Sequence, residues 1–175
     1  MIFLSEEDVD LKGPVTAWIQ QQNTDIQPVL SKFIDSYLYQ AIDTLYKPAY
    51  LNEFVVETTT MGVVLNCLSH IYNSSDPIHH SDYTKGSFTD GLIRGLGSIL
   101  PLHIRSEFSK EIFELCGESP IDTRRPLDCF YSRENASFNP YSLDALHDGS
   151  GLSFSDLFKN PMIRTIDVQR ALKII

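Results

Sequence analysis

The sequence is short of basic residues and has no long apolar run, and each shortage excludes a class of protein. Its 175 residues contain 14 lysines and arginines against 23 acidic residues. The resulting net charge of −9 argues against broad nucleic-acid binding, which needs a basic surface to neutralise phosphates. No apolar run approaches the roughly 20 residues of a membrane-spanning helix. The N-terminus has only four apolar residues, Met1–Leu4, before a serine and acids, unlike a signal peptide.

Cysteine is also scarce. Cys67, Cys116 and Cys129 are widely separated and odd in number, which favours reduced intracellular thiols over a disulfide framework. Cys67 and Cys116 fall at positions typical of buried helix faces. The length is that of one ordinary domain, or of a small domain with an extension, and is sufficient to bury a core.

Motifs for nucleotide and metal chemistry are missing. Neither a phosphate loop, G-x-x-x-x-G-K-[ST], nor a G-x-G-x-x-G after a strand occurs in the sequence. His79 and His80, with aspartates nearby, could supply metal ligands, but adjacent histidines on a loop seldom face one ion. A polar loop is the preferred interpretation there, and His70 is interpreted as a partly buried surface residue. Local chemistry therefore predicts neither a metal site nor a catalytic centre.

The clearest pattern that is present is helical periodicity between Ile26 and Tyr46. Apolar residues recur there in steps of three and one, so they fall on one wide stripe of an α-helix. Polar residues such as Gln27, Asp35 and Asp43 occupy the opposite face. A stripe of this width needs other helices to cover it, so this segment is predicted to be a core helix of a helical domain.

Further stretches with helical spacing are residues 15–22, 57–72, 88–100 and 104–115. Trp18 and Ile19 are predicted to anchor the first, and Gly117 to end the last. The apolar face of the second is predicted to consist of Met61, Val64, Leu65, Leu68, Ile71 and Tyr72. Residues 49–54 are predicted to be a connecting segment, and residues 73–87 an exposed loop.

The predicted helix over residues 88–100 contains three glycines, Gly91, Gly95 and Gly97. Each costs up to about 1 kcal/mol of helix stability relative to alanine. Glycines in a helix often mark close packing against another backbone or a ligand, so one of these two reasons is expected here.

Beyond Gly117 the helical period is lost, and prolines interrupt the chain. Residues 127–131 alternate well enough for a strand, and residues 137–141 could pair with it as a hairpin. Residues 163–175 then begin another amphipathic helix. An apolar strand-like start, Met1–Leu4, and an unfinished helix at the other end suggest a piece of something larger.

Several short sequence segments, taken in chain order, resemble one region of the dynein heavy chain. This region runs from the end of its second AAA+ module to the start of its third. The segments that carry the resemblance are Met1–Leu4, Val15–Trp18, Thr59–Leu68, Arg94–Leu100, Arg105–Phe108, Leu127–Tyr131 and Ile163–Arg170. They cover nearly the whole chain in the family's order. The chain has Arg94 where the family's helix usually has tryptophan, and Arg164 where the family usually has proline.

The resemblance implies a mainly α fold, an AAA+ small-subdomain or lid bundle of four to five helices, followed by a short hairpin and the start of another helix. Residues 1–14 would be the end of a large α/β subdomain and a connector, and residues 15–117 would form the lid. Residues 118–175 would be a linker with short strands that leads into the next module. Such a piece lacks the Walker A and Walker B motifs and would not hydrolyse ATP alone.

The resemblance also implies nucleotide contacts. Arg94 stands where AAA+ lids present an arginine that meets phosphate, with replacement of a packing tryptophan as the alternative. Ile163, Arg164, Thr165 and Asp167 stand where the adenine edge of the next site would be contacted. ATP or ADP would be bound by the full-length parent, with no cofactor expected in the piece alone.

The implied function is a nucleotide-site lid and relay within an ATP-driven microtubule motor. Its partners would be the rest of the ring and, through the whole motor, microtubules and dynein light and intermediate chains, with neither nucleic acid nor membrane. Its place would be the cytoplasm and cytoskeleton, including the axoneme of a cilium or flagellum. The alternative is a self-contained helical protein–protein interaction domain of unrelated origin without an enzymatic role.

Overall fold

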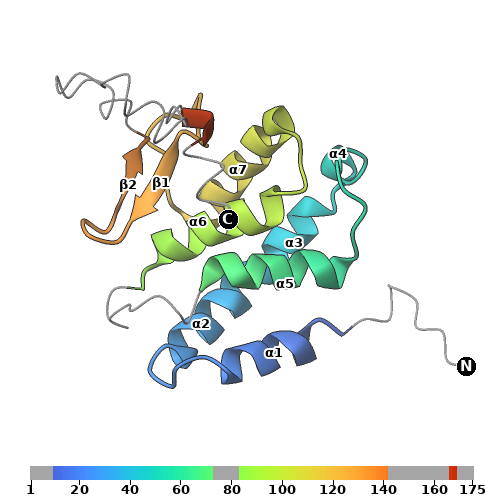
Figure 1. The fold of residues 1–175 in the computed structure, drawn as a ribbon, viewed down its shortest axis with the longest axis vertical. Helices are drawn as coiled ribbons and strands as arrows, with labels where there is room; N and C mark the ends of the chain where they lie inside the picture. The colour runs from blue at the N-terminus through green and yellow to red at the C-terminus, as the bar shows by residue number, and fades with distance from the viewer. Residues whose placement is uncertain (1–9, 73–82, 142–165, 169–175) are drawn as a thin grey trace, which may run out of the picture.

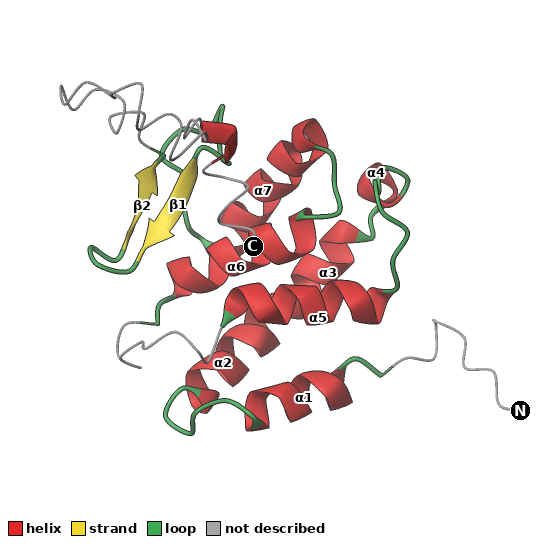
Figure 2. Ribbon diagram, viewed as in Figure 1, coloured by secondary structure: helices red, strands yellow, loops and turns green. Residues whose placement is uncertain are grey.

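The computed structural model describes residues 10–72, 83–141 and 166–168, which form a mainly helical body with a hairpin on one side (Figures 1 and 2). The elements, in chain order, are α1 (Lys12–Gln20), α2 (Gln27–Phe33), η2 (Ile34–Leu38), α3 (Tyr39–Leu45), α4 (Pro48–Leu51), α5 (Thr60–Ile71), α6 (Lys85–Gly97), α7 (Leu102–Cys116), β1 (Cys129–Ser132) and β2 (Ser137–Pro140). Residues 166–168 form a short helical segment. The predicted helical bundle, hairpin and later helix are confirmed.

The predicted core helix over residues 26–46 is present as α2, η2 and α3, which follow one another directly. Its first four buried residues lie four apart, at Ile26, Leu30, Ile34 and Leu38, and Ala41, Ile42 and Leu45 follow. A spacing of four drifts around an α-helix, which has 3.6 residues per turn. The π-helical turn η2 holds more residues per turn and returns these side chains to the core. The periodicity was visible in the sequence, whereas the π turn was not predicted.

Helices α5 and α6 pack closely because α6 has glycines where α5 crosses it. A Cβ atom at Gly91 would lie 2.8 Å from the Cα of Ile71, and one at Gly95 would lie 2.4 Å from the Cα of Cys67. Asn66 on α5 adds a hydrogen bond of 2.9 Å from its side-chain Nδ2 to the carbonyl of Gly95. Of the two expected reasons for these glycines, backbone packing is therefore the one observed.

The core lies where the long helix formed by α2, η2 and α3 meets α5, α6 and α7. Phe88 on α6 and Phe108 on α7 are fully buried there. Phe33 and Tyr37 of the long helix contact Phe88, at ring-centroid distances of 5.5 and 6.3 Å. Helix α7 ends at Gly117, which adopts a left-handed conformation with φ of 62° that favours glycine. The predicted stop at this residue is confirmed.

Strands β1 and β2 form an antiparallel hairpin in which Tyr131 lies opposite Phe138. Phe138 extends from the hairpin to Phe113 on α7, with ring centroids 5.1 Å apart. Cys129 is buried, as are the other two cysteines. The hairpin predicted from residues 127–141 is confirmed, and aromatic side chains attach it to the helical body.

Three details of the sequence prediction are wrong. Leu65 is half exposed, and Val63 takes its expected place in the core of α5. Helix α6 begins at Lys85 rather than residue 88, because Thr84 caps it by accepting a hydrogen bond from the Ser87 amide. The one-turn helix α4, Pro48–Leu51, overlaps the predicted connection over residues 49–54.

Two expectations for the first helix and the following loop are refined. Trp18 and Ile19 are only partly buried, and Val15 is the fully buried anchor of α1. In the segment expected to be an exposed loop, Tyr83 is buried and donates its hydroxyl hydrogen to the carbonyl of Ile71, at 2.9 Å. Residues 73–82 lie outside the described part of the chain. None of the helices in the described ranges is both long and apolar enough to cross a membrane.

A charged contact joins α7 to the end of the long helix. Lys47 Nζ lies 2.5 Å from Glu111 Oε2, and the hydroxyl of Tyr50 donates to the other carboxylate oxygen. Burial alone raises the pKa of Glu111, but these two hydrogen bonds outweigh it and the pKa is lowered. The carboxylate therefore stabilises the fold above its unfolded-state pKa, and this contribution is lost as the pH falls through the folded-state value.

Replacing Glu111 by glutamine is expected to lower the free energy of unfolding at pH 7 by up to about 1 kcal/mol, because this ion pair is partly exposed. The difference from wild type should shrink as the pH falls below the carboxylate's ordinary range. Urea unfolding at pH 7 and at pH 3.5 measures both values. Glu107→Gln, which removes an exposed pair with Lys110 on the same helix, is the control. An equal loss of unfolding free energy at both pH values would mean that the charge of the Glu111 carboxylate does not stabilise the fold.

Candidate functional site between α6 and the hairpin

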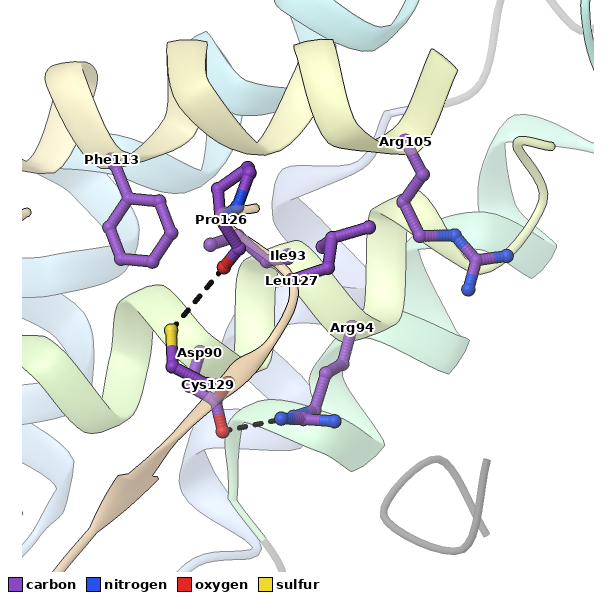
Figure 3. A pocket seen from close by; sticks show the side chains of 8 residues that line it. All are labelled: Asp90, Ile93, Arg94, Arg105, Phe113, Pro126, Leu127 and Cys129. Atoms are coloured by element: carbon purple, nitrogen blue, oxygen red, sulfur yellow. Dashed lines mark hydrogen bonds and ion pairs between the residues drawn. The ribbon is translucent and has the colours of Figure 1, made fainter. Parts of the chain in front are cut away.

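Helix α6 places Asp90 and Arg94 on one face, one turn apart. Arg94 Nε donates to Asp90 Oδ2 at 2.9 Å, and the two side chains are 11% and 19% exposed (Figure 3). This is therefore a largely buried ion pair, in contrast to the exposed pair between α7 and Lys47. An arginine in such a place needs its charge compensated, and Asp90 does this.

Tyr141 completes the surroundings of Arg94 from the far end of the hairpin. Arg94 donates a second hydrogen bond from its guanidinium to the Tyr141 hydroxyl, at 2.9 Å. Tyr141 is itself held in place, because its amide donates to the carbonyl of Asp128 and its ring lies 5.3 Å from that of Phe130. Arg94 therefore connects α6 to the residue that follows β2.

The charges of this site are well defined. Burial alone lowers the pKa of Arg94, but the Asp90 carboxylate and Tyr141 outweigh it and raise the pKa above its ordinary value. Arg94 is therefore a permanent cation. Burial, together with the nearby charge of Arg94, lowers the pKa of His70 on α5 below 6.5. His70 is half-buried, as expected from the sequence, and is neutral at physiological pH.

Two hollows adjoin Arg94. The first is a cavity of about 20 Å³ between α6, α7 and the start of β1, where Cys129 donates to the carbonyl of Pro126 (Figure 3). It has room for about one water molecule. The second is an open groove of about 650 Å³ lined by His70, Arg94 and, from the hairpin, Phe130 and Arg133. The groove is within the size range of small-molecule sites.

The groove brings charged residues of both signs together. Its cations, Arg94 and Arg133, are matched by two acids, Asp90 and Glu134. Within the described ranges, no three histidine, cysteine or acidic residues lie close enough together to hold a metal ion. The histidine pair considered from the sequence, His79 and His80, lies outside those ranges.

The structure describes two of the five residues predicted to contact nucleotide. Arg94 is paired with Asp90 and Tyr141, and Asp167 is exposed in the short helical segment at residues 166–168. Ile163, Arg164 and Thr165 lie outside the described residues.

Sequence reasoning missed both partners of Arg94. The spacing of Asp90 and Arg94, four residues apart in a predicted helix, was a usable signal for an ion pair. Tyr141 lies 47 residues from Arg94 along the chain, and no local pattern connects the two.

In the described part of the chain, five longer helices form a bundle: α1, the long helix, α5, α6 and α7. The hairpin follows α7 in the sequence. This is the architecture of the small lid subdomain of an AAA+ ATPase. The comparisons with known proteins agree with this class. A family model described as cytoplasmic dynein 2 heavy chain 1, AAA+ ATPase domain, matches residues 10–116. The chain therefore belongs to the cytoplasmic dynein 2 heavy chain family, which confirms the resemblance to dynein heavy chains and narrows it.

Curated relatives match almost the whole chain. Cytoplasmic dynein 2 heavy chain 1 of Homo sapiens is 36% identical over 172 residues, which is 98% of this chain and 4% of the relative. The protein of the same name from Tripneustes gratilla is 35% identical over the same share of each chain. That from Mus musculus is 34% identical, again over 98% of this chain. The chain thus spans about 4% of the length of these relatives.

Proposed function

We propose that this chain acts as the helical lid of an AAA+ module in a dynein heavy chain, and relays movement of that lid to the following module. The observation that carries the proposal is where the family match lies. It covers residues 10–116, and α1 to α7 occupy residues 12–116 of the same stretch. The part of the chain that resembles the AAA+ domain is therefore the helical body itself.

The remaining parts of the proposal follow from the same relationship. The parent heavy chain would bind ATP or ADP, contact the other modules of its ring, and move along microtubules. Light and intermediate chains would join it in the assembled motor, which would work on the cytoskeleton and in cilia or flagella. Arg94 and the segment Ile163–Asp167, including Arg164 and Thr165, are the proposed nucleotide contacts.

A heavy chain that carries a single substitution in α6 tests the lid proposal. Gly95→Ala forces α5 and α6 apart, because the new Cβ would lie 2.4 Å from the Cα of Cys67. We expect at least an approximately tenfold loss of microtubule-stimulated ATPase rate, or about 1.4 kcal/mol in barrier height. ATP hydrolysis and microtubule gliding by the purified heavy chain are the measurements.

The control is Gly97→Ala, two residues away in the same helix, where the new Cβ would lie 3.1 Å from a side-chain atom, Cγ of Arg105, rather than against backbone. Its heavy chain should retain ATPase and gliding rates within about twofold of wild type. Microtubule binding without nucleotide should persist in both variants, which separates a damaged relay from general misfolding. A Gly95→Ala heavy chain that hydrolyses ATP and glides at the wild-type rate would refute the lid role.

A further inference from the structure

The hairpin is attached to the N-terminal end of α6 through Tyr131. The ring of Tyr131 covers Gly86 so closely that a Cβ atom there would lie 2.3 Å from its Cε2. Thr84, the cap of α6, donates its hydroxyl hydrogen to the Tyr131 hydroxyl. Phe138 supports the ring from the paired strand, with centroids 5.2 Å apart. Gly86 is therefore the space into which the hairpin fits.

A second attachment lies toward the other end of the same helix. There Arg94 donates to the hydroxyl of Tyr141, which is 6% exposed and directly follows β2. Gly86 and Arg94 are eight residues apart in α6, which corresponds to about 12 Å along the axis at 1.5 Å per residue. Two attachments this far apart fix the direction of the hairpin as well as its position.

The helix to which the hairpin is attached is itself packed tightly against α5. At Gly91 and Gly95 the two helices approach so closely that any side chain at these positions would clash with the backbone of α5. Helices α5 and α6, the hairpin and Tyr141 are thus joined by contacts that each restrict rotation.

We propose that the hairpin, together with Tyr141 directly after it, is a rigid extension of α6 held by a two-point latch at Gly86–Tyr131 and Arg94–Tyr141. An isolated two-stranded hairpin is marginally stable at best, so the order of this one must come from its contacts with α6 and, through Phe138 and Phe113, with α7. Residues 118–141 then belong mechanically to the helical body rather than to a linker. Any tilt of α6 therefore moves the hairpin and Tyr141 with it. The use of this movement as a relay rests on the proposed function.

Hydrogen exchange of the full 175-residue chain, without nucleotide, tests the latch separately from motor activity. In the wild type, the amides of β1 and β2 should exchange within about tenfold of those of α6, because both open in one event. Gly86→Ala should speed hairpin exchange at least about tenfold while α5 stays protected. Tyr141→Phe, which removes the second attachment without adding volume, should act in the same direction.

Gly13→Ala is the matched control, because Gly13 is the second residue of α1 as Gly86 is of α6, and its new Cβ would meet nothing nearer than 3.8 Å. Gly13→Ala should change the hydrogen-exchange rates of neither the hairpin nor α5. Wild-type hairpin amides that exchange more than about a thousandfold faster than α6 would overturn the latch. Unchanged hairpin exchange in both Gly86→Ala and Tyr141→Phe would also overturn it. If the exchange data support the latch but the Gly95→Ala heavy chain keeps the wild-type ATPase and gliding rates, only the proposed function is refuted.

Discussion

Replacing Gly95 by alanine is expected to destabilise the isolated chain by about 3 kcal/mol or more, although alanine is the better helix former by about 1 kcal/mol. The added methyl group would lie 2.4 Å from the Cα of Cys67 and 3.0 Å from its Cβ. A backbone atom cannot turn aside as a side chain can, so α5 and α6 must separate. The separation also weakens the hydrogen bond from Asn66 to the Gly95 carbonyl. Overpacking of this kind outweighs the gain in helix propensity.

Urea unfolding followed by circular dichroism measures this effect. Gly97→Ala adds the same methyl group to the same helix but meets side-chain atoms, Arg105 Cγ at 3.1 Å and Phe108 Cδ1 at 3.6 Å. These can shift by a few tenths of an ångström, so its stability should stay within about 1 kcal/mol of wild type. Gly91→Ala should lower the stability as Gly95→Ala does, because its Cβ would lie 2.8 Å from the Cα of Ile71. Equal stabilities of Gly95→Ala and Gly97→Ala would mean that the two helices are not locked by backbone contact.

Hydrophobic periodicity predicted most of this fold because burial follows local spacing in helices. The core helix over residues 26–46 could be identified in this way, the hairpin from the alternation along its strands, and the stop at Gly117 from the glycine itself. Leu65 was misassigned because Val63 and Leu65 both fit a helical stripe, and only the position of α6 decides which is covered. The π turn at Ile34–Leu38 depends on the same kind of tertiary packing.

The site was less predictable than the fold. Arg94 was identified as unusual because it replaces a tryptophan of the family pattern, and the structure places it at the junction of α6 with the hairpin. Asp90 was within reach of sequence reasoning through its spacing. Tyr141 was not, because the hairpin has first to fold back along α6. The groove beside Arg94 likewise requires both elements to be in place.

Arg94→Met is expected to lower the free energy of unfolding by about 3 kcal/mol, because it leaves the Asp90 carboxylate partly buried without its cation. The double variant Arg94→Met with Asp90→Asn removes both charges, and should recover to within about 1–2 kcal/mol of wild type. A double-mutant cycle from urea unfolding gives the coupling of the pair. Additive losses in the double variant would mean that the two side chains stabilise the fold independently.

The same double variant separates a phosphate contact from a purely structural role for Arg94. Asp90 and Tyr141 occupy two donors of a guanidinium that has five, and Arg94 lines the 650 Å³ groove, so donors remain for a phosphate. A charge-assisted hydrogen bond is worth about 1.5–3 kcal/mol. We therefore expect the heavy chain with the double variant to lose at least about tenfold in affinity at one class of nucleotide sites, measured with fluorescent ADP.

Asp90→Asn alone is the control for that measurement. It keeps the arginine and removes a carboxylate that would repel phosphate, so nucleotide affinity should be retained or increased. If the double variant instead binds nucleotide as the wild type does, Arg94 acts only on Asp90 and Tyr141. Arg94 would then be a packing residue that joins α6 to the hairpin. The tryptophan of the family pattern would fill the same space without a charge.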